Sequence, residues 1–187
     1  MGKVTFDISM SLDGFVTASN ISPEEPMGVG GQRLHEWAFG GEDQRNREVL
    51  ERGLNATGAV IAGRRTYDAS IAWWGADGPT GPARTPLFVV SHSVPKDTPE
   101  GGVYTFVDGI ESALKRAKEV AGDKAVNIMG GPDIAQQYIR AGLVDDISIH
   151  LVPVLFGSGT RLFEQLDNEH IHSSKRLRRS TLLRQLI

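Results

Sequence analysis

Short apolar segments alternate with amphipathic segments along most of this chain, and this alternation restricts the fold more than any other feature. The segments 58–63, 86–91 and 125–129 are apolar almost throughout, which is typical of strands buried on both faces of a sheet. Between such segments, apolar residues recur at helical spacing, as over residues 110–120. The sequence therefore predicts an α/β fold: one domain with a mostly parallel central sheet, right-handed crossovers and flanking helices.

The same patterns place the remaining elements. Asp108 stands three residues before Glu111, which is a capping-box signal for the helix over 110–120. No helical pattern separates the last strands, so the C-terminal edge of the sheet is predicted to be antiparallel. Further strands are expected at 3–9, 103–107 and 145–156, helices at 42–55, from about residue 66 and at 133–141, and loops at 18–31 and 72–85.

The composition excludes several classes of protein. The chain has 187 residues, a length that suits one domain. No apolar run approaches the roughly 18 residues of a membrane span, and the first residues do not form the pattern of a secretion signal. The chain contains no cysteine, which excludes disulfides and thiolate metal sites and fits a cytoplasmic protein.

The charge is distributed unevenly along the chain. The net charge is −3, although residues 173–187 contain five basic residues and no acidic one. The remainder of the chain is therefore acidic, which argues against a nucleic-acid surface. We predict a domain over residues 1–172 and a basic C-terminal tail over 173–187, which is either solvated and disordered or in contact with an anionic partner.

The segment 127–139, NIMGGPDIAQQYI, passes from a predicted strand through two glycines into a predicted helix. Backbone N–H groups at a helix N-terminus can bind phosphate, and residues without a Cβ let a ligand approach. The alternative is a tight turn before an ordinary helix, and this segment does not decide between the two. Asp133 in the first helical turn counts slightly against an anion, because it already supplies negative charge there.

Two other predicted strands end in hydrogen-bond donors. The first runs into Gly63, Arg64, Arg65 and Thr66, and the second into 91–93, Ser-His-Ser. Arginine offers several donors to a phosphate, and Thr66 can cap a helix or bind a phosphate. Three such strand ends together predict an extended ligand with several phosphates, such as a dinucleotide. Each one alone is also explained by a surface arginine pair or a polar loop.

The segment 11–15, SLDGF, follows the first predicted strand. Asp13 and Gly14 form a turn signal. The turn is either an ordinary connection or part of a ligand pocket in which Asp13 binds a polar group.

Together these segments resemble the dihydrofolate reductase superfamily, and in particular the branch that includes the C-terminal reductase domain of bacterial riboflavin biosynthesis. SLDGF, GRRTYD, VVSHS, IMGGPDI and DDISIHLVPVLFGSGTRLF occur in the order of that family and at about its spacing. The resemblance covers roughly residues 3–166. It implies a dihydrofolate-reductase-like fold and NADPH as the hydride donor.

The resemblance also implies roles for particular residues. Residues 63–66 would contact the cofactor phosphates, and Ser91 and His92 would lie near the adenosine end, where a 2′-phosphate sits. The pyrophosphate would lie against Gly130, Gly131, Pro132, Asp133 and Ile134. Asp13 and Gly14 would flank the nicotinamide and the substrate, with the loop 156–160, which begins at Phe156, near the same pocket.

The sequence departs from the family in two places. True folate reductases carry an acidic residue on the helix after the first loop, and neither Asp43 nor Glu48 matches it clearly. Dihydrofolate is therefore not the expected substrate. The chain also ends in a basic segment where the family usually has an alternating strand.

We therefore predict a stand-alone NADPH-dependent reductase that transfers a hydride to a C=N or C=O carbon of a pteridine- or pyrimidine-like ring. Asp13 or ordered water would donate the proton. Trp37 either walls the flat substrate, together with Trp73 and Trp74, or packs in the core or between subunits. Arg33 and Arg161 are available for a substrate phosphate. Family members often pair, so we expect a homodimer.

Two other functions remain open. The first is a nucleotide-binding protein without catalysis, whose tail contacts a partner. The second is a metal hydrolase that uses His150, His170 and His172, although no further ligand completes a zinc site at a recognisable spacing. We predict no metal.

Overall fold

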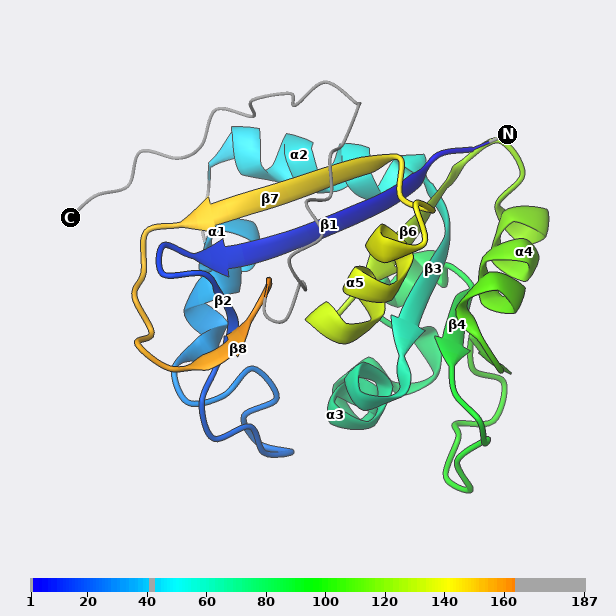
Figure 1. Ribbon diagram of the computed structural model, residues 1–187, viewed down its shortest axis with the longest axis horizontal. Helices are drawn as coiled ribbons and strands as arrows, with labels where there is room; N and C mark the ends of the chain where they lie inside the picture. Colours follow the sequence, from blue (N-terminus) through cyan, green and yellow to red (C-terminus); the bar gives the residue numbers. More distant parts are fainter. Residues whose placement is uncertain (1, 41–42, 164–187) are drawn as a thin grey trace.

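A six-stranded sheet forms the centre of the computed structural model, which describes residues 2–40 and 43–163 (Figure 1). The strand order is β5-β4-β3-β6-β1-β7, and every neighbouring pair is parallel. The six predicted strands are confirmed. Their bounds are β1 Val4–Ser11, β3 Thr57–Gly63, β4 Leu87–Val90, β5 Tyr104–Val107, β6 Ala125–Met129 and β7 Asp146–Val152.

A separate two-stranded sheet contains the antiparallel pairing. It joins β2 (Phe15–Ala18) to β8 (Gly159–Arg161). The prediction of an antiparallel C-terminal edge is therefore wrong for β7, which runs parallel to β1. The reason is the helix α5 (Pro132–Arg140), which lies between β6 and β7 and returns the chain to the starting end of the sheet. The chain reverses only after Val152, on its way to β8.

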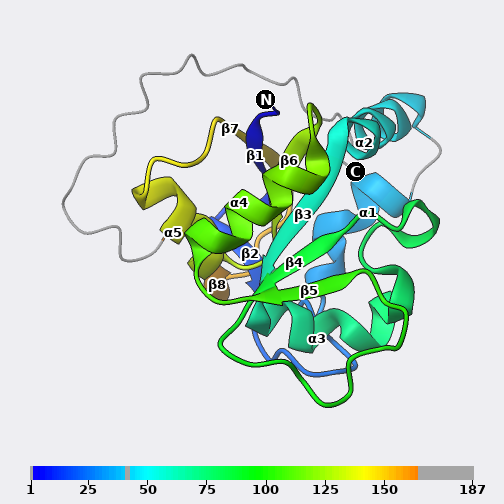
Figure 2. The same ribbon diagram turned by 90° about the vertical axis from the view of Figure 1, so that its right-hand side faces the viewer.

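Helices lie against both faces of the sheet (Figure 2), and an apolar cluster lies on each face. On one face, α5 and α4 (Ile110–Ala121) pack against residues such as Phe6, Ile61 and Ile128. On the other face, α3 (Arg64–Trp74) packs against the half of the sheet formed by β3 and β4. The short helix α1 (Glu36–Phe39) and α2 (Gln44–Ala56) precede β3 and lie at the β1 and β7 end of that second face. The 3₁₀ turns are η1 Gly31–His35, η2 Gly75–Asp77 and η3 Gly81–Ala83.

Two helix predictions need correction in detail. α2 forms where predicted, but none of its described residues is buried, and its Leu54 is 48% exposed. The N-cap of α4 is Gly109, with a positive φ of 80°, and no side chain caps it. Asp108 therefore does not form a capping box and instead pairs with His92, at 2.8 Å between Oδ1 and Nδ1.

The helices that follow the neighbouring strands β3 and β6 lie on opposite faces of the sheet. The chain leaves β3 for α3 on one face and leaves β6 for α5 on the other. In open α/β sheets, ligands bind outside the carboxyl ends of strands at such a switch point. This places the ends of β3 and β6, where the glycines lie, at the expected binding position.

Candidate functional site

The turn between β6 and α5 is shaped by Gly130 and held by Thr66. Gly130 has a φ of 99°, which a residue with a Cβ rarely adopts. A Cβ on Gly130 would lie 2.4 Å from the Thr66 Oγ1 atom. The N–H of Gly131 donates to that same Oγ1 at 3.1 Å. The two glycines thus let the N-terminal ends of α5 and α3 approach each other closely.

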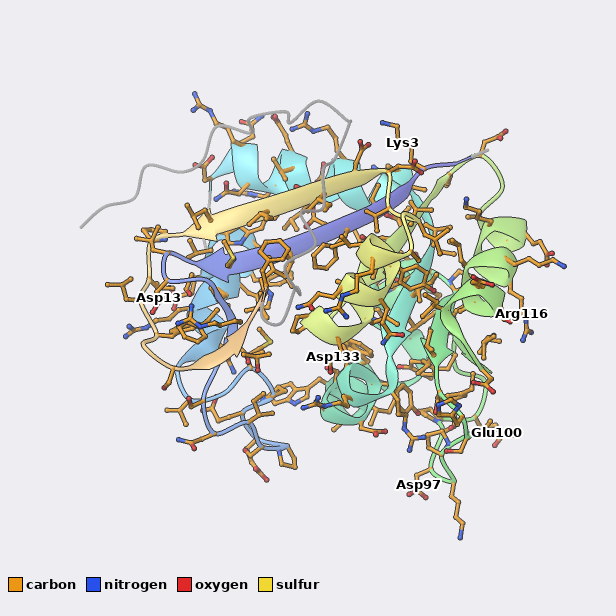
Figure 3. All side chains as sticks on the ribbon, in the orientation of Figure 1. Lys3, Asp13, Asp97, Glu100, Arg116 and Asp133 are labelled. Atoms are coloured by element: carbon orange, nitrogen blue, oxygen red, sulfur yellow. The ribbon has the colours of Figure 1, made fainter. Side chains whose placement is uncertain are left out.

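The N-terminal end of α3 supplies two arginines beside this turn. Gly63 is the N-cap of α3, and Gly131 is the N-cap of α5; neither helix has a side-chain cap within the described part of the chain. Arg65 donates from Nη1 to Asp133 Oδ2 at 3.0 Å, an ion pair whose two side chains are both largely exposed. Figure 3 shows Asp133 at the end of α5 that adjoins α3. The ion pair offsets the negative charge that Asp133 brings to the first turn of α5.

Arg64 connects the end of β3 to the end of β4. Its Nη1 atom lies 3.2 Å from Ser91 Oγ, from Ser93 Oγ and from the Ser93 carbonyl oxygen. Its Nε atom donates to Asp68 Oδ1 at 2.7 Å. His92, between the two serines, is exposed on the same loop. Of the two predicted adenosine-end residues, Ser91 contacts this guanidinium group, whereas His92 pairs with Asp108.

This set of residues fits a phosphate-bearing cofactor. Two adjacent helix N-termini point first-turn N–H groups and their dipoles to the same side, and two arginines stand beside them. Two of the predicted residues fit only in part. Pro132 is buried and has no N–H, and the side chain of Ile134 lies in the core, so Ile134 can offer only its backbone.

Asp13 connects two loops rather than standing free. Its carboxylate accepts hydrogen bonds from Ser11 Oγ at 2.6 Å, from the Gly157 N–H at 2.7 Å and from the Phe156 N–H at 3.1 Å. The hydrogen bond from Ser11 is the largest of the causes that lower the pKa of Asp13 below its ordinary value. A carboxylate that is ionised and fully engaged does not fit the predicted role of proton donor. Asp13 holds the β1–β2 turn to the loop before β8.

The other residues predicted near the substrate lie around the same turn. Gly14 has a φ of 88°, and its carbonyl oxygen accepts from the Leu162 N–H at 3.0 Å. Phe156 lines a surface hollow of about 290 Å³ together with Arg33. Arg161 donates to the carbonyl oxygen of Asp13 and lies over the Phe15 ring, so it already stabilises the turn.

Trp37 belongs to a polar cluster that the sequence reasoning did not identify. Its indole Nε1–H donates to Ser9 Oγ at 2.9 Å, and its ring stacks on the His150 imidazole with centroids 4.4 Å apart. The His150 Nε2 atom lies 3.0 and 3.1 Å from the two carboxylate oxygens of Asp7. The alternating pattern of β1 could have indicated this cluster, because Asp7 and Ser9 are polar residues of a central strand in a sheet predicted to be buried.

The remaining candidates are placed elsewhere. Trp74 packs against the apolar cluster that α3 forms with β3 and β4. Trp73 is exposed and donates to the Pro23 carbonyl oxygen at 3.3 Å. Asp43 caps α2 through a 2.8 Å bond from the Arg45 N–H, which explains its presence without a substrate. No group of three metal-ligating side chains occurs in residues 2–40 and 43–163; His170 and His172 lie outside them, as does the predicted tail.

Comparison with protein families identifies the domain. The model of the RibD C-terminal domain matches residues 2–184. The chain belongs to the RibD C-terminal domain family. A protein of Bacillus subtilis (strain 168), the uncharacterized YwjB, is 27% identical over 110 residues, which are 59% of this chain and 60% of YwjB.

The fold agrees with this family. A crystal structure of a candidate riboflavin biosynthesis protein from Shewanella sp. PV-4 superposes with a TM-score of 0.62 at 23% identity, covering 89% of this chain and 85% of that one. The dihydrofolate-reductase-like fold that the resemblance implied is thereby confirmed. The matched family is that of the RibD C-terminal domain, which is of the riboflavin-pathway reductase type. No helix among the described residues is long and apolar enough to cross a membrane.

Proposed function

We propose that this protein is an NADPH-dependent reductase that acts on a C=N or C=O bond of a small heteroaromatic substrate. The observation that carries the proposal is the pair of glycine-bearing strand ends at the switch point of the sheet, where two helix N-termini and Arg64 converge. The family membership supports the reductase chemistry.

The cofactor would be held by residues from three strand ends. The N-terminal turns of α3 and α5 would bind the pyrophosphate, with Thr66 holding the two turns together. Arg64 would bind the 2′-phosphate that distinguishes NADPH from NADH, with Ser91 and Ser93 directing its guanidinium group. Arg64 bonds Asp68 as well, so part of its donor capacity is already used.

When bound, NADPH supplies a hydride, and the substrate takes up that hydride and one proton. The protein positions the acceptor carbon and shields it from water. The β1–β2 turn, fixed by Asp13, and the loop that begins at Phe156 would flank the substrate. Because Asp13 is engaged as an acceptor, we assign the proton to ordered water or to another acidic group.

A homodimer in the cytoplasm belongs to the same proposal. The edge strand β7 exposes apolar side chains on the face beside α5: Ile147 is 46% and Leu151 is 40% exposed. Burial of such a face by a second copy would stabilise a pair by the hydrophobic effect.

The test compares the binding of NADPH and NADH by calorimetry. Wild-type protein should bind NADPH more tightly. The variant Arg64→Ala should lose about ten- to a hundredfold in NADPH affinity, the typical loss when a hydrogen bond to a charged group is removed, and little in NADH affinity. Arg116→Ala on α4, far from the site in Figure 3, serves as the control. Equal losses for both cofactors in Arg64→Ala would sink the 2′-phosphate assignment. A protein that binds neither cofactor contradicts the reductase proposal as a whole.

A further inference from the structure

The helix α5 carries a buried polar side chain, Gln136, whose partner lies at the end of β8. Gln136 is 7% exposed, and α5 and β8 lie side by side in both Figure 1 and Figure 2. Its Nε2 atom donates to the Leu162 carbonyl oxygen at 2.9 Å, and its Oε1 atom accepts from Arg140 Nη2 at 3.4 Å. A buried amide costs free energy unless it is hydrogen-bonded, whereas an apolar side chain of the same size would pack without this cost. The amide therefore has a task other than filling the core.

Leu162 links this amide to the β1–β2 turn. Leu162 is fully buried and directly follows β8. Its carbonyl oxygen accepts from Gln136, and its N–H donates to the Gly14 carbonyl oxygen at 3.0 Å. The preceding residue, Arg161, donates to the Asp13 carbonyl oxygen at 3.1 Å. The chain at the end of β8 thus holds the β1–β2 turn on one side and is itself held by α5 on the other.

The same helix begins at the turn that we assign to the cofactor. Its N-cap is Gly131, whose N–H donates to Thr66 Oγ1. Gln136 stands little more than one helical turn further along α5. The backbone hydrogen bonds of a helix are internal, so a short helix moves as one rigid element. Any restraint on the first turn of α5 is therefore felt at Gln136.

Around this hydrogen bond, α5 and β8 are not packed continuously. A surface hollow of about 340 Å³ lies between them, lined among others by Gln137 and Arg140 of α5 and by Thr160 and Arg161 of β8. Gln136 also borders this hollow and bridges the two elements directly. The link between the helix and the end of β8 is therefore local, and a change of one side chain can break it.

We propose that Gln136 is a positioning residue that transmits cofactor binding at the first turn of α5 to the β1–β2 turn. The inference rests on the proposed reductase function and adds a route between its cofactor and substrate sites. NADPH bound to the first N–H groups of α5 would reduce the motion of the helix, and Gln136 and Leu162 would pass this restraint to Gly14. A ligand that orders one element lowers the cost of ordering a second element coupled to it. The cofactor-bound protein would therefore hold the β1–β2 turn more firmly for a substrate.

The experiment measures amide hydrogen exchange by mass spectrometry, with and without saturating NADPH. The N–H groups of Leu162, Phe156 and Gly157 report on the turn, because the first donates to Gly14 and the other two to Asp13. In the wild type, NADPH should slow exchange in peptides that contain them by about fivefold or more, the lower end of typical couplings between two sites.

Two variants of Gln136 remove the donor in different ways. Gln136→Met keeps the length of the side chain and brings no charge. Gln136→Glu keeps the shape and an acceptor for Arg140 but has no N–H for Leu162. In both variants NADPH should still slow exchange at the start of α5 and should no longer slow it in the peptides of the turn.

Two matched controls separate transmission from a general loosening of α5. Tyr138→Phe removes another hydrogen bond of this helix, from the buried Tyr138 hydroxyl to the Ile110 carbonyl oxygen at 2.6 Å, which leads to α4 instead. Gln137→Glu adds the charge of Gln136→Glu at the neighbouring, exposed position. In both controls NADPH should slow exchange at the turn as it does in the wild type.

Each other outcome has a definite meaning. An NADPH effect at the turn that survives in the Gln136 variants, or that Tyr138→Phe also abolishes, would overturn the inference. Failure of both Gln136 variants to fold would show a purely structural side chain and overturn it as well. If NADPH binds to the wild type without slowing exchange at the turn, the inference fails and the reductase proposal stands. If NADPH does not bind at all, both fail.

Discussion

Replacing Gly130 by alanine is expected to lower the free energy of unfolding by about 1.5–3.5 kcal/mol, from two separate causes. A left-handed backbone costs a residue with a Cβ about 1–2 kcal/mol, and Gly130 has a φ of 99°. The new Cβ would also lie 2.4 Å from Thr66 Oγ1 and 2.5 Å from Thr66 Cγ2. Thr66 must then move and give up its bond to the Gly131 N–H, which costs about 0.5–1.5 kcal/mol.

Urea and thermal unfolding measure this cost. For a domain of this size, each kcal/mol lowers the melting temperature by about 2–4 °C, so Gly130→Ala should melt about 3–14 °C lower than the wild type. Gly131→Ala is the matched control. Gly131 has a φ of −64°, and its Cβ would lie an ordinary 3.8 Å from Thr66 Oγ1, so its melting temperature should stay close to that of the wild type.

A double-mutant cycle separates the two causes. In a Thr66→Ala background the two closest atoms, Oγ1 and Cγ2, are gone and only the contact with the Cβ of residue 66, at 2.9 Å, remains, so the cost of Gly130→Ala should fall toward the backbone term of about 1–2 kcal/mol. A cost of Gly130→Ala that is the same in both backgrounds would refute the close approach to Thr66. A Gly131→Ala variant as unstable as Gly130→Ala would refute the role assigned to the positive φ.

Two further predictions concern the loop contacts and the sheet edge. Asp13→Asn should be less stable than the wild type at neutral pH, because the folded protein lowers the pKa of Asp13. This contribution to stability is present above the ordinary carboxyl pKa and is lost as pH falls through the lowered value. The free energies of unfolding of the two proteins, measured in urea, should therefore converge at acid pH. A difference that stays constant across pH would contradict this reasoning. Ile147→Glu on the exposed face of β7 should convert a wild-type dimer to a monomer in sedimentation experiments, and a monomeric wild type would rule out the dimer.

Three strands of the central sheet, β3, β4 and β6, were predictable because they are apolar almost throughout. The strands β1 and β7 were predictable from their alternating pattern. β2 and β8 were not predictable, because they are four and three residues long and form only by pairing with each other across the chain. The direction of β7 was missed although α5, which sets it, was predicted at 133–141, because the last strands were taken to follow each other without a helix between them.

Only those site residues that have a local sequence signature could be predicted. Gly130 and Arg64 could be proposed because a glycine after a strand and an arginine at a helix start have local signatures. Asp7 and His150 are 143 residues apart, and only the pairing of β1 with β7 brings them together. The role of Asp13 could not be read from the sequence either, since its partners at 156 and 157 reach it through the same long-range fold.

The position of β1 also governs the order in which the protein can assemble. β1 is made first, yet its two neighbours in the sheet come late; Thr5 reaches its partner Asn127 across 122 positions, and β7 follows still later. The β3–β4–β5 half has neighbours close in sequence and can form early, whereas β1 must wait with its apolar face uncovered until most of the chain has been synthesised. Contacts of such long range slow folding and leave the waiting strand open to wrong partners. The late pairing of β1 with β6 and β7 thus makes the early nascent chain dependent on protection from wrong strand pairing.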